Sequence, residues 1–156
     1  FKQKTAYEIR LSLVGSEMCK ETDTGFQKNG IPNTALAAIS GLVGNTGSQT
    51  SFNYLAVGTG ATAFAASQTT LITEVINHGL VRTTATITRS TTTQTNDTLQ
   101  LDYTWTASGG SSDTIAEIGV FNASSVGIML ARKVVSPAIT VGSGQLLQAT
   151  YKVIFS

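Results

Sequence analysis

The chain has a single histidine, His78, so a catalytic triad or a histidine-containing metal site would have to be built around it. Its sequence neighbours are Asn77, Gly79 and Leu80, and no cysteine or carboxylate stands at the spacing that metal ligands require. The sequence therefore predicts a histidine in a surface loop, and it predicts no metal site.

Carboxylates are the next candidates, because two of them across a cleft can hydrolyse a glycosidic bond. Glu74 and Glu117 are the glutamates of the last two-thirds of the chain, and Asp102 and Asp113 could serve as their partners. Nothing in the spacing places two of these groups across a cleft. We therefore predict no catalytic residues and no enzyme, and rank a glycan hydrolase that uses Glu117 last among the alternatives.

Glu117 is notable for its surroundings, since it stands in the apolar run Ile115-Ala-Glu-Ile-Gly-Val-Phe121. A carboxylate there needs a buried cation or several backbone donors, because burying an unpaired charge is costly. Arg132, in Leu130-Ala-Arg-Lys-Val134, and Arg82 are the natural partners. We expect a structural ion pair or a hydrogen-bond anchor at Glu117.

The segment Val57-Gly-Thr-Gly-Ala-Thr62 is glycine-rich, as phosphate-binding loops are. A dinucleotide fingerprint would need a third glycine and a long helix after it, and a P-loop would need Gly-Lys-Ser/Thr. Both are missing from this segment. We interpret Gly58 and Gly60 as flexible backbone where a strand meets a loop, and we predict no cofactor.

The composition narrows the class of partner. Ten basic and nine acidic residues leave a net charge of +1, and charged residues make up 12% of the 156-residue chain. Phosphate binding needs clustered lysine and arginine, so nucleic acid is not expected as a partner. No apolar stretch approaches the roughly 20 residues that span a bilayer, so no membrane is expected either. A low-charge surface rich in threonine, serine and glycine favours a protein packed against other proteins.

The clearest element of the sequence is Thr98–Thr106, which alternates strictly between apolar and polar residues. Its apolar positions are Leu99, Leu101, Tyr103 and Trp105, and its polar positions are Thr98, Gln100, Asp102, Thr104 and Thr106. Period two over this length predicts a strand that is buried on one face. Core packing explains Tyr103 and Trp105 better than a platform for sugar or peptide.

The same approach predicts the other elements. Strands are expected at Thr5–Val14, Asn53–Val57, Leu80–Ser90, Thr114–Phe121, Gly127–Val135 and Gln145–Phe155, a loop at Gly15–Gly30, a helix at Thr34–Leu42 ending at Gly41 and Gly44, one or two helical turns at Leu71–Ile76, and a hairpin turn at Gln94–Asp97. Ile128–Ala131 is apolar on both faces, which favours a central strand, and Pro137 should close that strand at an edge. The predicted fold is mainly β, an antiparallel β-sandwich or small barrel with one short helix and an extended N-terminal arm. We divide the chain into an arm over residues 1–30 and a β-rich domain over residues 31–156.

Several motifs resemble a recurrent pattern in structural proteins of tailed bacteriophages. They are Tyr54-Leu-Ala-Val-Gly-Thr-Gly-Ala-Thr62, Thr70-Leu-Ile-Thr-Glu-Val75 with Arg82, Ala116-Glu-Ile-Gly-Val-Phe-Asn-Ala123, Gly127-Ile-Met-Leu-Ala-Arg132 and a closing strand that ends at Val153-Ile-Phe-Ser156. Together they cover the chain from about Lys28 to its end, and the first 30 residues match the pattern least.

The resemblance implies a virion component without enzymatic activity. The leading expectation is a capsid decoration (cement) protein, a small oligomer such as a trimer, that binds the major capsid protein on the outer surface of the head. An arm over Phe1–Val14, carrying Phe1, Tyr7, Ile9 and Leu11, would pair with the sheet edge of a neighbour.

Two alternatives remain open. One is a tail-tube, tail-tip or fibre-attachment module of the same virion. The other is an extracellular filament subunit that assembles by strand donation, with Phe1–Val14 as the donor strand. A filament subunit should polymerise unaided, whereas a decoration protein should stay small in solution.

Overall fold

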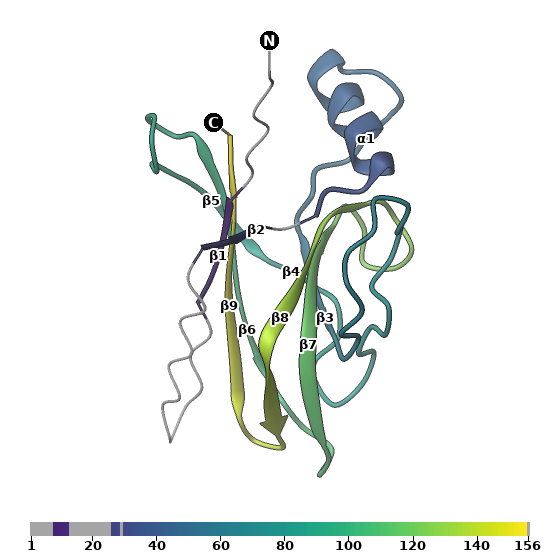
Figure 1. Cartoon of the computed structure of the whole chain (residues 1–156), viewed down its shortest axis with the longest axis vertical. Coiled ribbons are helices and arrows are strands. Elements are labelled where there is room, and N and C mark those ends of the chain that lie inside the picture. The colour runs from purple at the N-terminus through teal and green to yellow at the C-terminus, as the bar shows by residue number, and fades with distance from the viewer. Residues whose placement is uncertain (1–7, 13–25, 29, 156) are drawn as a thin grey trace.

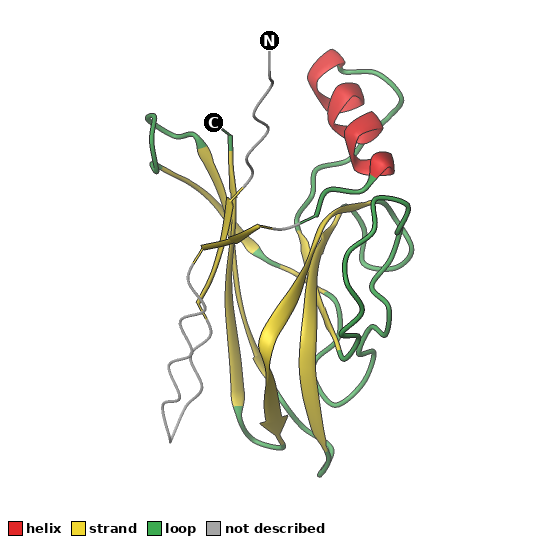
Figure 2. Cartoon of the chain, viewed as in Figure 1, coloured by secondary structure: helices red, strands yellow, loops and turns green. Residues whose placement is uncertain are grey.

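The computed structural model describes residues 30–155, together with the backbone of residues 8–12 and 26–28. In these ranges the chain forms two antiparallel sheets that face each other, and one helix (Figures 1 and 2). The five-stranded sheet has the order β2 (Phe26–Lys28), β1 (Glu8–Ser12), β9 (Leu146–Ile154), β6 (Thr98–Thr106), β5 (Thr86–Ser90). The four-stranded sheet has the order β4 (Thr83–Thr84), β3 (Tyr54–Gly58), β7 (Ser112–Phe121), β8 (Met129–Gly142). This architecture confirms the predicted mainly-β fold and is that of a sandwich.

The hydrophobic core fills the space between the two sheets. The five-stranded sheet contributes Leu101, Trp105 and Tyr151, and the four-stranded sheet contributes Leu55 and Val120. Leu101 and Trp105 lie on β6 at alternate positions, as the period of two predicts, and Trp105 is 2% exposed. The apolar face of β6 is therefore core, and the other face of that strand is the outer face of the sandwich.

The helix α1 (Asn33–Gly44) lies at one end of the sandwich, outside both sheets (Figure 1). It buries Ala35 and Ala38 and ends where Asn45 takes a left-handed conformation with φ of 50°. The N–H of Asn45 then donates to the carbonyls of Gly41 and Leu42, which would otherwise lack a partner. The helix predicted at Thr34–Leu42 is confirmed, and Gly44 ends it as expected, whereas Gly41 lies within the helix.

The predicted single strand Leu80–Ser90 is wrong, because this stretch is divided between the two sheets. β4 pairs with β3, and β5 pairs with β6 in the other sheet. Ala85, 7% exposed, stands at the corner, and its N–H donates to Asn53 O. The alternating pattern continues through the corner, so the sequence period gives no sign of the change of sheet.

The helical turns predicted for Leu71–Ile76 are also absent, since this stretch is not helical in the described structure. The N–H groups of Ile72 and Thr73 donate to the Glu117 carboxylate instead of to helical carbonyls. Glu74 forms an isolated antiparallel bridge with Gly58. A distant side chain has therefore replaced the local hydrogen bonds that a helix needs.

Strand β8 lies at the edge of its sheet, so the central position predicted from Ile128–Ala131 is wrong. Met129–Arg132 is nevertheless buried on both faces, because the core covers one face and the segment with Thr62 and Leu71 covers the other. Pro137 does not close the strand, which continues to Gly142. The register between β7 and β8 jumps from Glu117↔Val134 to Ile115↔Ile139, which places Pro137 in a bulge of an edge strand, where its missing N–H is tolerated.

The N-terminal region contains more strand than expected. β2 lies within the predicted loop Gly15–Gly30, and it pairs with β1. β1 in turn pairs with β9 of the same chain, with Leu11 opposite Tyr151. Of the arm residues, Ile9 and Leu11 therefore lie on a strand of this chain's own five-stranded sheet. Phe1 and Tyr7 lie outside the described residues.

The turn between β5 and β6 is organised by one carboxylate, that of Asp97. Its oxygens accept from the hydroxyl and N–H of Thr93 at 2.6 and 2.7 Å, and from the N–H groups of Gln94 and Thr92, both at 2.8 Å. The Thr93 hydroxyl first, and then the Gln94 N–H, hold the pKa of Asp97 far below its ordinary value of 3.8. The predicted hairpin turn is thus confirmed, with the aspartate as its centre.

We expect this turn to persist in mild acid, where Asp97 stays ionised, and to be lost when a neutral side chain replaces Asp97. The pKa of Asp97 is lower in the folded state than in the unfolded state, so its carboxylate stabilises the fold at pH values above 3.8. This stabilisation is lost as the pH falls through the folded-state pKa. At about pH 3, amide exchange protection of Thr92–Gln94 should persist, whereas Asp97→Asn should remove it at neutral pH. Asp102→Asn, on the outer face of β6, is the matched control. The prediction would be contradicted if the wild type at about pH 3 lost as much exchange protection as Asp97→Asn loses at neutral pH.

Candidate functional site

Residues 59–82, which connect β3 to β4, run along the outer face of the four-stranded sheet (Figure 1). This segment contains much of the glycine-rich motif and the expected ion-pair candidate Arg82. Two arginine–glutamate pairs fix it in place, one buried beneath it and one at its margin.

The buried pair joins Glu117 of β7 to Arg132 of β8. Arg132 Nε donates to Glu117 Oε2 at 2.5 Å, and both side chains are 0% exposed. The remaining lone pairs of Glu117 accept from the N–H groups of Gly60, Ile72 and Thr73 at 3.2, 3.1 and 2.8 Å. Of the two arginines proposed from the sequence, the structure places Arg132 against Glu117.

Arg132 fastens the same segment from the other side. Its terminal nitrogens donate to Thr62 O at 2.9 Å, to Gly60 O at 3.4 Å and to the side-chain oxygen of Gln68 at 3.4 Å. Its backbone N–H and C=O exchange hydrogen bonds with Gly30, both at 3.0 Å. The pair therefore satisfies its own hydrogen-bonding groups while it holds the chain on both sides, which makes its role one of anchoring.

The two glycines of Val57–Thr62 are required for space. A Cβ on Gly58 would lie 2.5 Å from Glu117 Oε1 and from Thr73 O, and a Cβ on Gly60 would lie 2.5 Å from the Cβ of Ile72. Both residues are buried. The interpretation as flexible backbone is therefore replaced by a steric one, since the segment must pass close to the Glu117 carboxylate.

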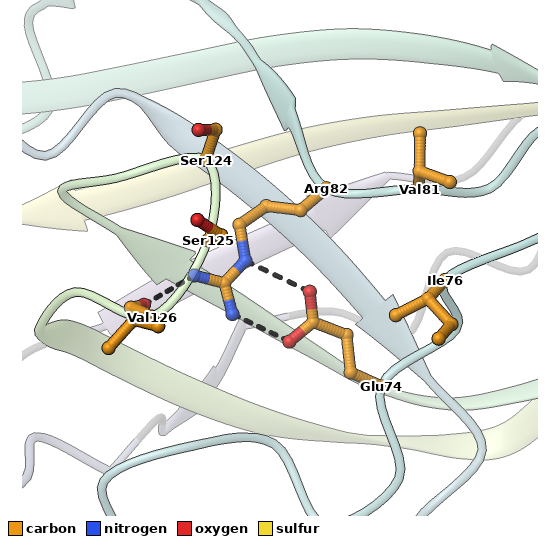
Figure 3. Close-up of a pocket in the computed structure, with 7 residues that line it drawn as sticks. All are labelled: Glu74, Ile76, Val81, Arg82, Ser124, Ser125 and Val126. Carbon is orange, nitrogen blue, oxygen red and sulfur yellow. Dashed lines mark hydrogen bonds and ion pairs between the residues drawn. The ribbon is translucent and has the colours of Figure 1, made fainter.

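Arg82 forms the second pair, with Glu74 rather than with Glu117. Its Nε and one terminal nitrogen donate to the two carboxylate oxygens at 2.9 and 2.6 Å, in the parallel geometry that makes such pairs strong (Figure 3). The other terminal nitrogen donates to Val126 O at 2.7 Å and Ala123 O at 3.2 Å, in the loop between β7 and β8. The guanidinium carbon lies 3.6 Å from the centre of the Phe121 ring.

A groove of about 320 Å³ lies over this pair, lined by Glu74, Ile76, Val81, Arg82, Ser124, Ser125 and Val126 (Figure 3). The ion pair is part of its lining, and both charges are already engaged with each other. The pairing of Arg82 with Glu74 was not predicted, because no local signal in the sequence marks it. Glu74 lies in the loop segment and Arg82 directly precedes β4, and only the path of the chain between them brings them together.

His78 lies in a loop, as expected, and it contacts a carboxylate that the sequence spacing did not suggest. Its Nδ1 is 2.8 Å from Asp113 Oδ2, at the start of β7. The side chains are 29% and 17% exposed. In the part of the chain that the structure describes, no group of three or more histidine, cysteine or acidic side chains could hold a metal ion. Cys19 lies outside that part.

Each carboxylate between residues 30 and 155 accepts hydrogen bonds from the chain itself. Glu74, Asp97, Asp113 and Glu117 are described above, and Asp102 accepts from Thr150 Oγ1 at 2.6 Å and Gln100 Nε2 at 2.7 Å. The arrangement suits holding loops and strands in position.

The outer face of β5, β6 and β9 forms a continuous three-stranded surface of the five-stranded sheet. Along β5, β6 and β9, the positions opposite the core are Thr86, Thr88, Gln100, Asp102, Thr104, Thr106, Leu146, Gln148, Thr150 and Lys152. Asp102 and Lys152 are the charged residues among them. The face is thus broad, nearly neutral and rich in threonine, as the alternation in Thr98–Thr106 predicts for β6.

No protein-family model, curated protein or solved structure matches this chain. No helix in the described ranges is long and apolar enough to cross a membrane.

Proposed function

We propose that this protein is a non-enzymatic structural component of a tailed-bacteriophage virion, in the first place a capsid decoration protein. The observation that carries the proposal is the nearly neutral, threonine-rich outer face that β5, β6 and β9 form in the five-stranded sheet. Low charge reduces the desolvation penalty when a surface is packed against another protein, and threonine on neighbouring strands gives a flat contact surface. The resemblance of the motifs to phage structural proteins supplies the kind of partner.

The charged groups of the fold support the same proposal. A general acid or base must reach its substrate, yet the carboxylates from Glu74 to Glu117 are all engaged by internal donors. Their shared effect is to hold the loops rigidly on the sandwich. A preorganised surface loses less entropy on association, which favours a protein that works by binding.

The mechanism would be stabilisation by mass action. Subunits that bind only the mature head lattice stabilise it by RT ln(1 + [L]/Kd), which is about 2.7 kcal/mol per site at 100 times Kd. Many sites on a shell would add to a large total without any catalytic step. The partner surface would be that of the major capsid protein.

Cryo-electron microscopy of whole particles from the source tests the location. We expect density for this sandwich over the capsid lattice. Density confined to the tail would overturn the decoration role in favour of a tail-tube, tail-tip or fibre-attachment module. Density in free filaments, with none on particles, would overturn the virion proposal in favour of the strand-donating filament subunit.

A pair of surface variants tests the contact face. Thr88→Lys with Thr104→Lys places two charges on the exposed outer face of the five-stranded sheet. This variant should bind stripped heads at least tenfold more weakly than wild type, with an unchanged melting temperature. Ser111→Lys with Ser143→Lys adds the same charge at exposed turns and is the control. Equal binding by all three proteins would contradict a role for this face.

A further inference from the structure

The helix α1 presents apolar side chains to solvent without a charge anywhere along its length. Its sequence is NTALAAISGLVG, and Leu36 and Val43 are 53% and 85% exposed. These two residues are seven apart, which is close to two helical turns, so they lie on the same side of the helix. A surface helix normally has charged and polar residues on its outer face. The outer side of α1 instead carries Leu36 and Val43 with Ser40 between them, and exposed apolar side chains grouped in this way are typical of an interaction surface.

The position of α1 leaves this side accessible. Figure 1 shows the helix at one end of the sandwich, beyond the ends of β7 and β8 and outside both sheets. Its contact with the domain is made through small residues, Ala35 and Ala38. Leu36 and Val43 are not among the core residues of the domain, so the core does not require apolar side chains at these two positions.

We propose that α1 pairs with the α1 of a second copy of this chain, antiparallel across a two-fold axis. In this arrangement Leu36 of each copy packs against Val43 of the other. Ser40, between them on the same side, lies near the axis, where a small side chain lets the two helices approach closely. The patch is then self-complementary, as a two-fold interface requires.

The distribution of charge favours a second copy as the occupant. The first turn of α1 has no acidic residue and the last turn has no basic residue, so the partial charges at the helix ends are not compensated by side chains. Antiparallel pairing places the positive end of each helix beside the negative end of the other. The absence of charged residues also means that no like charges meet across the axis.

The proposal goes beyond the virion role and does not depend on it. A two-fold contact also differs from the trimer that the resemblance implies. Self-association is measured on the isolated protein, whereas the virion role is measured on particles, so either can fail without the other.

Sedimentation velocity of the full chain over a concentration series tests the pairing. We expect a monomer–dimer equilibrium for the wild type, and a dissociation constant at least tenfold higher for Leu36→Gln with Val43→Gln, because two buried apolar contacts are lost from each copy. The melting temperature should not fall, since both side chains are exposed. Ile76→Gln, which alters a 77% exposed residue of the groove, is the control and should dimerise as the wild type does. A monomeric wild type, a trimer, or a dimer unaffected by the double variant would overturn the proposal.

Cysteine cross-linking tests the antiparallel geometry directly. In a Cys19→Ser background, Ser40→Cys should form a disulfide-linked dimer under mild oxidation, because the two side chains meet near the axis. Leu42→Cys, two positions from Ser40 and therefore on the opposite side of the same helix, replaces a 39% exposed side chain and should not cross-link. Efficient cross-linking of both variants, or of neither, would overturn the arrangement.

Discussion

Replacing Glu117 with alanine is expected to lower the free energy of unfolding by about 3–5 kcal/mol, the range for breaking a buried ion pair. Arg132 would keep its charge at 0% exposure without its carboxylate partner. The N–H groups of Gly60, Ile72 and Thr73 would also lose their acceptor, which adds to the loss. Urea denaturation followed by tryptophan fluorescence measures the change.

The matched control is Asp113→Ala, which removes the carboxylate of the partly exposed pair with His78. Such pairs contribute about 0–1 kcal/mol, so Glu117→Ala should lower the free energy of unfolding several times more than Asp113→Ala does. Adding Arg132→Met to Glu117→Ala should recover part of the loss, because the second change removes the unpaired charge. Equal losses for Glu117→Ala and Asp113→Ala would contradict the anchoring role.

The same experiment bears on the glycan hydrolase alternative. A catalytic Glu117 would give a stable Glu117→Gln protein that has lost hydrolytic activity. An anchoring Glu117 gives a destabilised protein, because the amide –NH₂ would face the guanidinium of Arg132 or the backbone N–H groups of the loop. We expect the second result.

Replacing Trp105 with alanine is expected to cost about 3–5 kcal/mol, the range for removing a large aromatic side chain from a core. Trp105 is 2% exposed and lies edge-to-face with Tyr103, with ring centres 5.0 Å apart. Its indole Nε1 donates to Val81 O at 2.9 Å, directly before Arg82 in the chain. The core is thereby connected to the segment that carries the groove pair.

Trp105→Phe separates the two contributions. It should cost less than the alanine change, since most of the apolar volume remains and the hydrogen bond to Val81 contributes about 1 kcal/mol. Amide exchange at Val81 and Arg82 should nevertheless become faster in this variant. Thermal denaturation and hydrogen exchange measure the two effects, and unchanged exchange at Arg82 would contradict the connection. Thr104→Ala, on the outer face of the same strand, is the control.

Much of the local structure could be predicted from the sequence. The alternation in Thr98–Thr106 predicts β6 and which of its faces is buried, because a pleated strand places successive side chains on opposite faces. Apolar spacing and Gly44 predict α1 together with its end. Gln94–Asp97 predicts the turn, since aspartate binds nearby backbone N–H groups. These features depend on residues only a few positions apart.

Features that depend on distant pairing could not be predicted in this way. The apolar run around Glu117 predicts that the carboxylate needs a cationic partner. The sequence alone does not show whether Arg82 or Arg132 is that partner. The register of β7 against β8 decides between them, because it sets Arg132 opposite Gly119, on the same face as Glu117 and with no side chain between. Arg82 is left to pair with Glu74.

The sequence by itself determined the mainly-β fold, the single predicted helix and the neutral, threonine-rich face, because strand period and composition are local properties. Only the tertiary structure decided that Ala85 is a corner between sheets, that β8 is an edge strand, and that a loop takes the place of a helix at Leu71–Ile76. In each of these cases the local pattern allows several outcomes. The hydrogen bonds and packing supplied by residues far away in the chain select one of them.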